Sequence, residues 1–61
     1  MPDEYLLEFI RIGKQVKVTA CDPESGTEAV IIGPAKATQR ELSELAIRKL
    51  QYVMKKGESS S

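Results

Sequence analysis

Three basic side chains, Arg11, Lys14 and Lys17, fall within one short stretch of the chain. Guanidinium and ammonium groups at this spacing can bind phosphate, so recognition of nucleic acid is the first chemistry to consider. The whole chain argues against it, because nine basic and nine acidic residues give a formal net charge of zero. A dedicated nucleic-acid binder usually carries a basic excess. A nucleic-acid-binding module that uses Arg11, Lys14 and Lys17 is therefore the alternative hypothesis.

Residues suited to catalysis are few. The chain has no histidine and a single cysteine, Cys21, so neither a Cys-His pair nor a Ser-His-Asp arrangement can be assembled. Ser25 lies in a predicted turn with no base near it in the sequence. Glu8 and Lys17 can be neighbours on adjacent strands, where a structural ion pair is the simpler interpretation. We predict that the protein is not an enzyme and assign no catalytic residue.

The sequence also lacks the usual metal and cofactor motifs. Without histidine the common zinc spacings cannot be written, and a single cysteine allows no internal disulfide. The acidic turn Asp22-Pro23-Glu24 offers too few oxygen ligands for calcium, which takes about six to eight. The glycines fit no phosphate-binding loop. We therefore predict no metal site, no cofactor-binding residue and no cofactor.

The elements that position these side chains are predicted from patterning and turn signals. Residues 5–12, 16–21 and 28–32 have the composition of strands. Gly13-Lys14 is a two-residue loop with glycine first, which is typical of a type II′ hairpin. In the turn 22–27, Asp22 can accept backbone hydrogen bonds and Gly26 can adopt a left-handed conformation. Pro34 then marks the exit from the sheet.

A helix should follow the third strand. Thr38 and Glu41 have the spacing of a capping box, and the apolar periodicity continues to about Lys56, with Gly57 as the stop. The predicted fold class is α+β, a three-stranded antiparallel β-meander followed by one C-terminal α-helix packed on one sheet face (β-β-β-α). Residues 1–57 form a single domain, and 58–61 are predicted to be a disordered polar tail.

The turns also fix the register. A two-residue loop at Gly13-Lys14 sets Phe9 opposite Val18, and a four-residue loop at 23–26 sets Val18 opposite Ile31. The second register is the weaker inference, because a slip by one residue exchanges the two faces of the third strand. One face, the natural bed for the helix, then carries Tyr5, Leu7, Phe9, Val16, Val18, Ala20, Ala29 and Ile31. The other carries Leu6, Glu8, Ile10, Ile12, Lys17, Thr19, Cys21, Val30 and Ile32.

That second face is unusually apolar. A solvated face should be mostly polar, yet five of its nine residues are large aliphatics. The helix stripe is also wider than one sheet face needs: its predicted centre is Leu42, Ala46 and Val53, with Leu45 and Leu50 at its edges, Ile47 and Met54 on one flank and Tyr52 on the other. Lys49 lies near the centre, where its ammonium group can reach outward, and Glu44 is expected to pair with Arg48 on the outer side. The predicted interface comprises Leu6, Ile10, Ile12, Val30, Ile32, Ile47 and Met54.

The small size of the chain suggests a role for this exposed apolar surface. A chain of 61 residues buries only about 60% of its unfolded surface, so its core needs a supplement. With disulfides and zinc excluded, oligomerisation is the remaining way to supplement the core. We predict a small, non-enzymatic protein-interaction module whose partner is a second copy in a homodimer or, as the alternative, another protein. No window is apolar enough for a membrane span and the N-terminus is acidic, so we expect a cytoplasmic protein.

One run of residues also resembles a run found in other proteins. The run F-x-R-I-G-x-x-V-K-V-x-A-x-D-P-x-x-G-x-E from Phe9 to Glu28, with Gly33-Pro34 and a helix ending near Tyr52-Val53, resembles short uncharacterised bacterial proteins of a domain-of-unknown-function family. The similarity covers about residues 5–54. It implies a bacterial protein that stands alone, and it brings no activity, cofactor or site residue.

Overall fold

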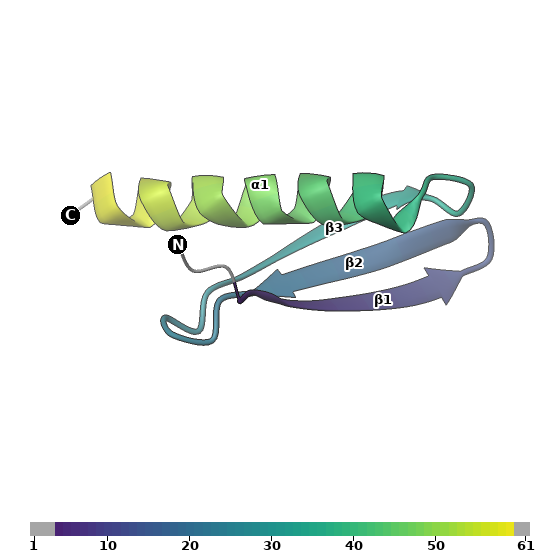
Figure 1. The fold of residues 1–61 in the computed structure, drawn as a ribbon. Coiled ribbons are helices and arrows are strands. Elements are labelled where there is room, and N and C mark those ends of the chain that lie inside the picture. The colour runs from purple at the N-terminus through teal and green to yellow at the C-terminus, as the bar shows by residue number, and fades with distance from the viewer. Residues whose placement is uncertain (1–3, 60–61) are drawn as a thin grey trace.

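A computed structural model of the chain describes residues 4–59. Three strands, β1 (Leu6–Ile12), β2 (Gln15–Cys21) and β3 (Glu28–Pro34), are followed by one helix, α1 (Gln39–Ser59). The strands form a single antiparallel sheet in the order β1-β2-β3, and α1 lies across one of its faces (Figure 1). The predicted α+β meander with one C-terminal helix is confirmed.

The predicted register holds at both turns. Gly13 has a φ of 63° and no non-glycine residue among those described has a positive φ, so the Gly13-Lys14 loop fits a type II′ turn and not type I′. Phe9 lies opposite Val18 in the β1–β2 pair. Val18 in turn lies opposite Ile31 in the β2–β3 pair. The two faces of the sheet therefore carry the residues that the sequence assigned to them.

The turn between β2 and β3 closes as expected from its residues. The backbone N of Asp22 donates to the carbonyl oxygen of Thr27 at 2.9 Å. Its carboxylate accepts from the backbone N of Glu24 at 3.2 Å. Gly26 has a φ of 76°, a conformation that side chains disfavour. Local chemistry in this turn thus sets the pairing of β2 with β3.

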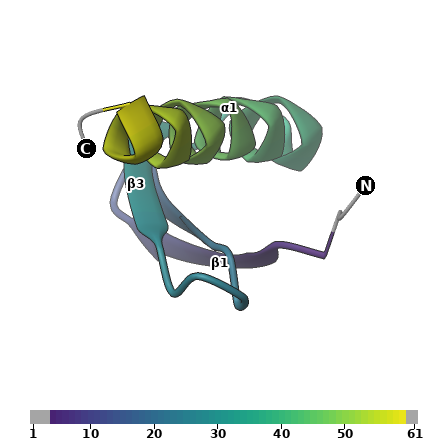
Figure 2. The same ribbon diagram turned by 90° about the vertical axis from the view of Figure 1, so that its left-hand side faces the viewer.

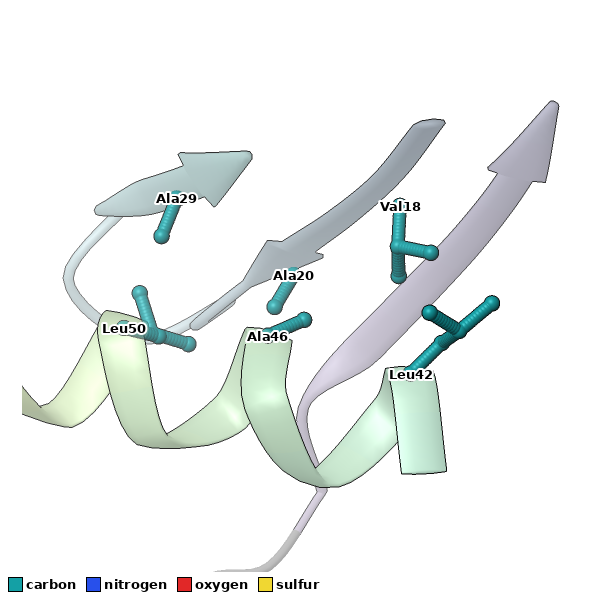
Figure 3. Packing of buried hydrophobic residues seen from close by; sticks show 6 residues of the cluster. All are labelled: Val18, Ala20, Ala29, Leu42, Ala46 and Leu50. Atoms are coloured by element: carbon teal, nitrogen blue, oxygen red, sulfur yellow. The ribbon is translucent and has the colours of Figure 1, made fainter. Parts of the chain in front are cut away.

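The core between sheet and helix is small. Three of its six buried hydrophobic residues, Ala20, Ala29 and Ala46, are alanines (Figure 3). Their short side chains let α1 approach β2 and β3 closely. Three larger side chains, Val18, Leu42 and Leu50, complete the buried cluster.

The helix is not centred on the sheet. It packs on β3 and β2, and Figure 2 shows β1 farther from the helix than β3. Leu7 and Phe9 of β1, and Tyr5 just before it, are consequently only partly buried at the border of the core. The off-centre position decides which helix residues meet the sheet.

The rotation of α1 differs in part from the predicted stripe. Leu42, Ala46 and Leu50 are 3%, 0% and 0% exposed and form its centre, so the placement of Leu50 at an edge was wrong. Val53 is only half-buried. Leu45, predicted at the other edge, is 50% exposed. Residues spaced by four lie along one side of a helix. Because Ala46 packs against the sheet, Leu42 and Leu50 on the same side also face it.

The start of α1 is confirmed. The hydroxyl of Thr38 accepts a hydrogen bond from the backbone N of Glu41 at 3.0 Å. The Glu41 carboxylate accepts in return from the backbone N of Thr38 at 3.1 Å. This reciprocal pair is the predicted capping box.

Two other details of α1 differ from expectation. The helix continues through Gly57 to Ser59, past its predicted end. A glycine costs a helix about 1 kcal/mol relative to alanine, which weakens the helix without forcing a stop. The first two residues of the predicted 58–61 tail are thus helical, and 60–61 lie outside the described residues. Glu44 pairs with Arg40, at 3.5 Å, instead of with Arg48. Each exposed i, i+4 ion pair stabilises a helix by only a few tenths of a kcal/mol, so the two partners are close in free energy.

Candidate interaction surface

The sheet face away from α1 carries five of the seven exposed large hydrophobic side chains of the described residues. Its aliphatic side chains are substantially exposed: Leu6 62%, Ile10 42%, Ile12 60%, Val30 37% and Ile32 62%. We call this surface the open face; it comprises Leu6, Glu8, Ile10, Ile12, Gln15, Lys17, Thr19, Cys21, Glu28, Val30, Ile32 and Pro34. Large aliphatics gathered on one exposed face usually mark an interface.

The register arranges the open face in rows. Ile10, Lys17 and Ile32 lie side by side across the three strands. The neighbouring row toward the β2–β3 turn places Glu8 and Val30 on either side of Thr19. The aliphatics therefore follow the two outer strands, and the side chains that the central strand β2 adds to this face are Gln15, Lys17, Thr19 and Cys21. The stem of Lys17, which is half-buried, lies between two isoleucines.

The predicted interface residues do not all lie on this face. Ile47 and Met54 belong to α1, on the other side of the sheet, and both are half-buried. Met54 packs against the core cluster. The exposed large apolar residues of α1 are instead Leu45, at 50%, and Tyr52, at 63%. On the flank assigned to an interface from the sequence, Met54 therefore turns toward the core, and Ile47 is half-buried.

The predicted basic cluster is divided by the register. Arg11 lies opposite Val16 on the helix side of the sheet, whereas Lys17 lies on the open face. Arg11 and Lys14 instead share a concavity of about 480 Å³ with Lys36, which belongs to the loop after β3. The sequence analysis did not include Lys36 in this cluster, because only the fold brings that loop beside the hairpin.

Glu8 and Lys17, the other charged pair considered from the sequence, occupy adjacent rows. Glu8 lies opposite Thr19, and Lys17 lies opposite Ile10. The two side chains are therefore diagonal neighbours on an exposed surface, where opposite charges interact weakly. Nothing in this arrangement indicates an acid–base function.

Residues with nucleophilic side chains have structural surroundings. Cys21 is a half-buried free thiol at the end of β2. The hydroxyl of Ser25 donates to Asp22 Oδ2 at 3.0 Å and accepts from the backbone N of Thr27 at 3.2 Å, so it helps to close the turn. Within residues 4–59 no three side chains of the Cys, Asp or Glu type gather in a way that could hold a metal ion.

The two edges of the sheet differ. Because β2 is central, β1 and β3 are both edge strands. The Nζ of Lys49, on α1, donates to the carbonyl oxygen of Val30 in β3 at 2.8 Å. Lys49 was expected to reach outward to solvent, and it reaches the sheet edge because α1 lies over β3. The contact occupies an acceptor on one edge of the sheet.

The length and apolar character required to cross a membrane are not found in any helix of the part of the chain described here.

Fold and surface together define a small α+β domain with a helix on one face of its sheet and exposed aliphatic side chains on the other. The chain belongs to the family Domain of unknown function (DUF6898), whose model matches residues 2–57. This confirms the resemblance to a domain-of-unknown-function family. No curated protein and no solved structure matches the chain.

Proposed function

We propose that this protein is a small interaction module that forms a homodimer through its open face. The carrying observation is the exposure of five aliphatic side chains on one side of a three-stranded sheet: Leu6, Ile10, Ile12, Val30 and Ile32. Burying aliphatic surface contributes about 25 cal/mol per Å². A domain with only six buried hydrophobic residues among those described gains a second core by placing two such sheets face to face.

Charge favours a second copy as the occupant of this face. A twofold axis that crosses the strands between the row of Glu8 and the row of Lys17 makes the two sheets antiparallel and places each of these rows over the other in the partner. A twofold axis along the central strand β2 would instead leave each row over itself and set Lys17 over Lys17. Like charges brought together in an interface cost several kcal/mol. The open face is therefore complementary to itself in one orientation.

The size of the face sets the expected affinity. Seven residues at about 3.3 Å and three strands at about 4.8 Å give a flat area of roughly 330 Å². A standard interface buries about 800 Å² of accessible surface on each partner. The open face is well below this standard size, in the class of weak and transient interfaces, so we expect a dissociation constant in the range of about 1–100 µM.

Other readings receive less support. Nucleic acid recognition by Arg11, Lys14 and Lys17 requires the three side chains to face one ligand, and the register places Lys17 on the opposite side of the sheet from Arg11. The non-enzymatic character and the cytoplasmic location stay predictions from the sequence. A different protein on the open face is an outcome that the following experiment distinguishes.

Sedimentation velocity across a dilution series from about 1 µM to about 1 mM tests the proposal. The expected result is a reversible monomer–dimer equilibrium for the wild-type chain. Ile32→Glu should yield monomers throughout, since Ile32 is 62% exposed and its replacement leaves the core intact. Leu45→Glu, at a site 50% exposed on α1, is the matched control and should still dimerise.

A charge exchange tests the orientation. Lys17→Glu should weaken the dimer, because the partner's acidic row then meets an acid. Adding Glu8→Lys should restore the dimer, because each copy again presents opposite charges. A wild-type chain that is monomeric at every concentration contradicts the homodimer and leaves the open face to another protein. A dimer that the charge exchange fails to restore contradicts the antiparallel arrangement.

A further inference from the structure

The end of the molecule that holds the β1–β2 hairpin also holds the loop between β3 and α1 (Figure 1). These two segments enclose the concavity of about 480 Å³, whose lining residues are Arg11, Lys14, Pro34, Ala35 and Lys36. Small-molecule sites usually have volumes of about 300–1,000 Å³. The concavity is thus large enough for a small organic molecule.

Backbone contacts hold the two walls of this concavity together. The backbone N of Ala35 donates to the carbonyl oxygen of Lys14 at 2.8 Å, which fastens the loop to the hairpin. The backbone N of Ala37 donates to the carbonyl oxygen of Pro34 at 3.0 Å and closes the loop on itself. Pro34 also restricts its own φ. The site is therefore held in place by main-chain bonds and not only by flexible side chains.

The charge of the lining is of one sign. Three of its five residues, Arg11, Lys14 and Lys36, are basic, and none is acidic. The Nε of Arg11 donates to the carbonyl oxygen of Gly13 at 2.9 Å, which anchors the guanidinium group at the hairpin. Like charges held this close repel one another, so an anion that lies among them gains an attraction to each.

The remaining lining residues define the second part of the ligand. Pro34 and Ala35 contribute apolar surface between the basic side chains. A phosphate monoester carries about −1.5 to −2 charge at pH 7 and three strong acceptor oxygens, which suits three cationic donors. An apolar group attached to it can then contact Pro34 and Ala35. We propose that this concavity binds a small phosphate monoester with an apolar body.

A longer polyanion fits the molecule less well. The opposite end of the sheet carries Asp22, Glu24 and Glu28, so a nucleic acid that runs along the strands meets acidic residues. The chain as a whole has no net positive charge to draw a polyanion. Of its five lining residues only Pro34 also belongs to the open face, so binding there does not require dimer formation.

Titration of the full chain with phenyl phosphate, followed by nuclear magnetic resonance of the backbone amides, tests the site. At about 0.15 M salt, where distant surface charges are screened, we expect saturable shifts confined to the hairpin and the loop after β3. Inorganic phosphate should bind more weakly, because it makes no apolar contact with Pro34. Phenol should produce no saturable shift, because it has no charge for the basic side chains.

Two double variants with the same change of charge separate a site from general attraction. Lys14→Gln combined with Lys36→Gln should weaken phenyl phosphate binding by about tenfold or more. Arg48→Gln combined with Lys55→Gln, at exposed positions along α1, should leave it within about twofold. Non-saturating shifts, or equal loss in both double variants, overturn the proposal. A short oligonucleotide that binds more tightly than phenyl phosphate overturns the assignment to a small ligand.

Discussion

Leu50 and Leu45 lie on the same helix, and the structure assigns them opposite roles. Leu50 is 0% exposed within the core, whereas Leu45 is 50% exposed. Truncation of both to alanine removes the same atoms from the same element of secondary structure. The pair therefore isolates the effect of burial from the effects of helix propensity and of composition.

The expected magnitudes follow from burial. Leu50→Ala should lower the free energy of unfolding by about 2–5 kcal/mol, because it loses buried surface and leaves a cavity. At about 0.05–0.15 kcal/mol per residue, the whole chain of 61 residues is stable by only about 3–9 kcal/mol. Leu50→Ala should thus unfold a large part of the population. Leu45→Ala should cost less than about 1 kcal/mol.

Urea unfolding followed by far-UV circular dichroism measures both values. The two variants and the wild-type chain are compared at one protein concentration, since association of folded chains adds to apparent stability. A similar loss for Leu45→Ala and Leu50→Ala would refute the reasoning, because it would mean that α1 is rotated from the position described or that the helix does not pack on the sheet. Preserved stability in both variants would mean that the core is elsewhere.

Two further changes test the seating of the helix and its start. Gly33→Ala should lower the free energy of unfolding by about 1–3 kcal/mol, because its new methyl group would collide with the buried side chain of Leu42; in a Leu42→Ala background the added loss should largely vanish, and an unchanged loss there would exclude this contact as the cause. Thr38→Ala should cost about 1 kcal/mol through loss of the helix cap, whereas Thr38→Ser should retain most of the stability, and equal values for the two substitutions in thermal unfolding would contradict the capping role.

Features set by local chemistry could be predicted from the sequence. The Gly13-Lys14 loop fixes the β1–β2 register, and Thr38 fixes the start of the helix. Features that depend on how α1 sits on the sheet could not. A helical wheel gives the width of an apolar stripe but not its rotation, so Leu50 and Leu45 received equal weight. Only contact with β2 and β3 separates them.

The same reason explains the changes in the candidate sites. The five aliphatics of the open face follow from strand alternation, which a sequence displays directly. Met54 was assigned to the interface because it lies at the flank of the predicted apolar stripe. The sequence does not show that α1 lies off-centre on the sheet, and it is this position that brings Met54 against the core. Lys36 was missed as a neighbour of Arg11 and Lys14 because the three side chains come together only when the loop after β3 is fastened to the hairpin.

The bond from Lys49 to the Val30 carbonyl has a consequence for aggregation. A sheet with two unprotected edges can add strands on both sides without limit, as fibres do. Here the helix supplies a cation to one edge, and Pro34, which has no backbone N–H, ends the same strand. Growth by strand addition at β3 is therefore obstructed. In the proposed homodimer, the exposed isoleucines would hold a second copy while the β3 edge gives that copy no template for a continuous filament.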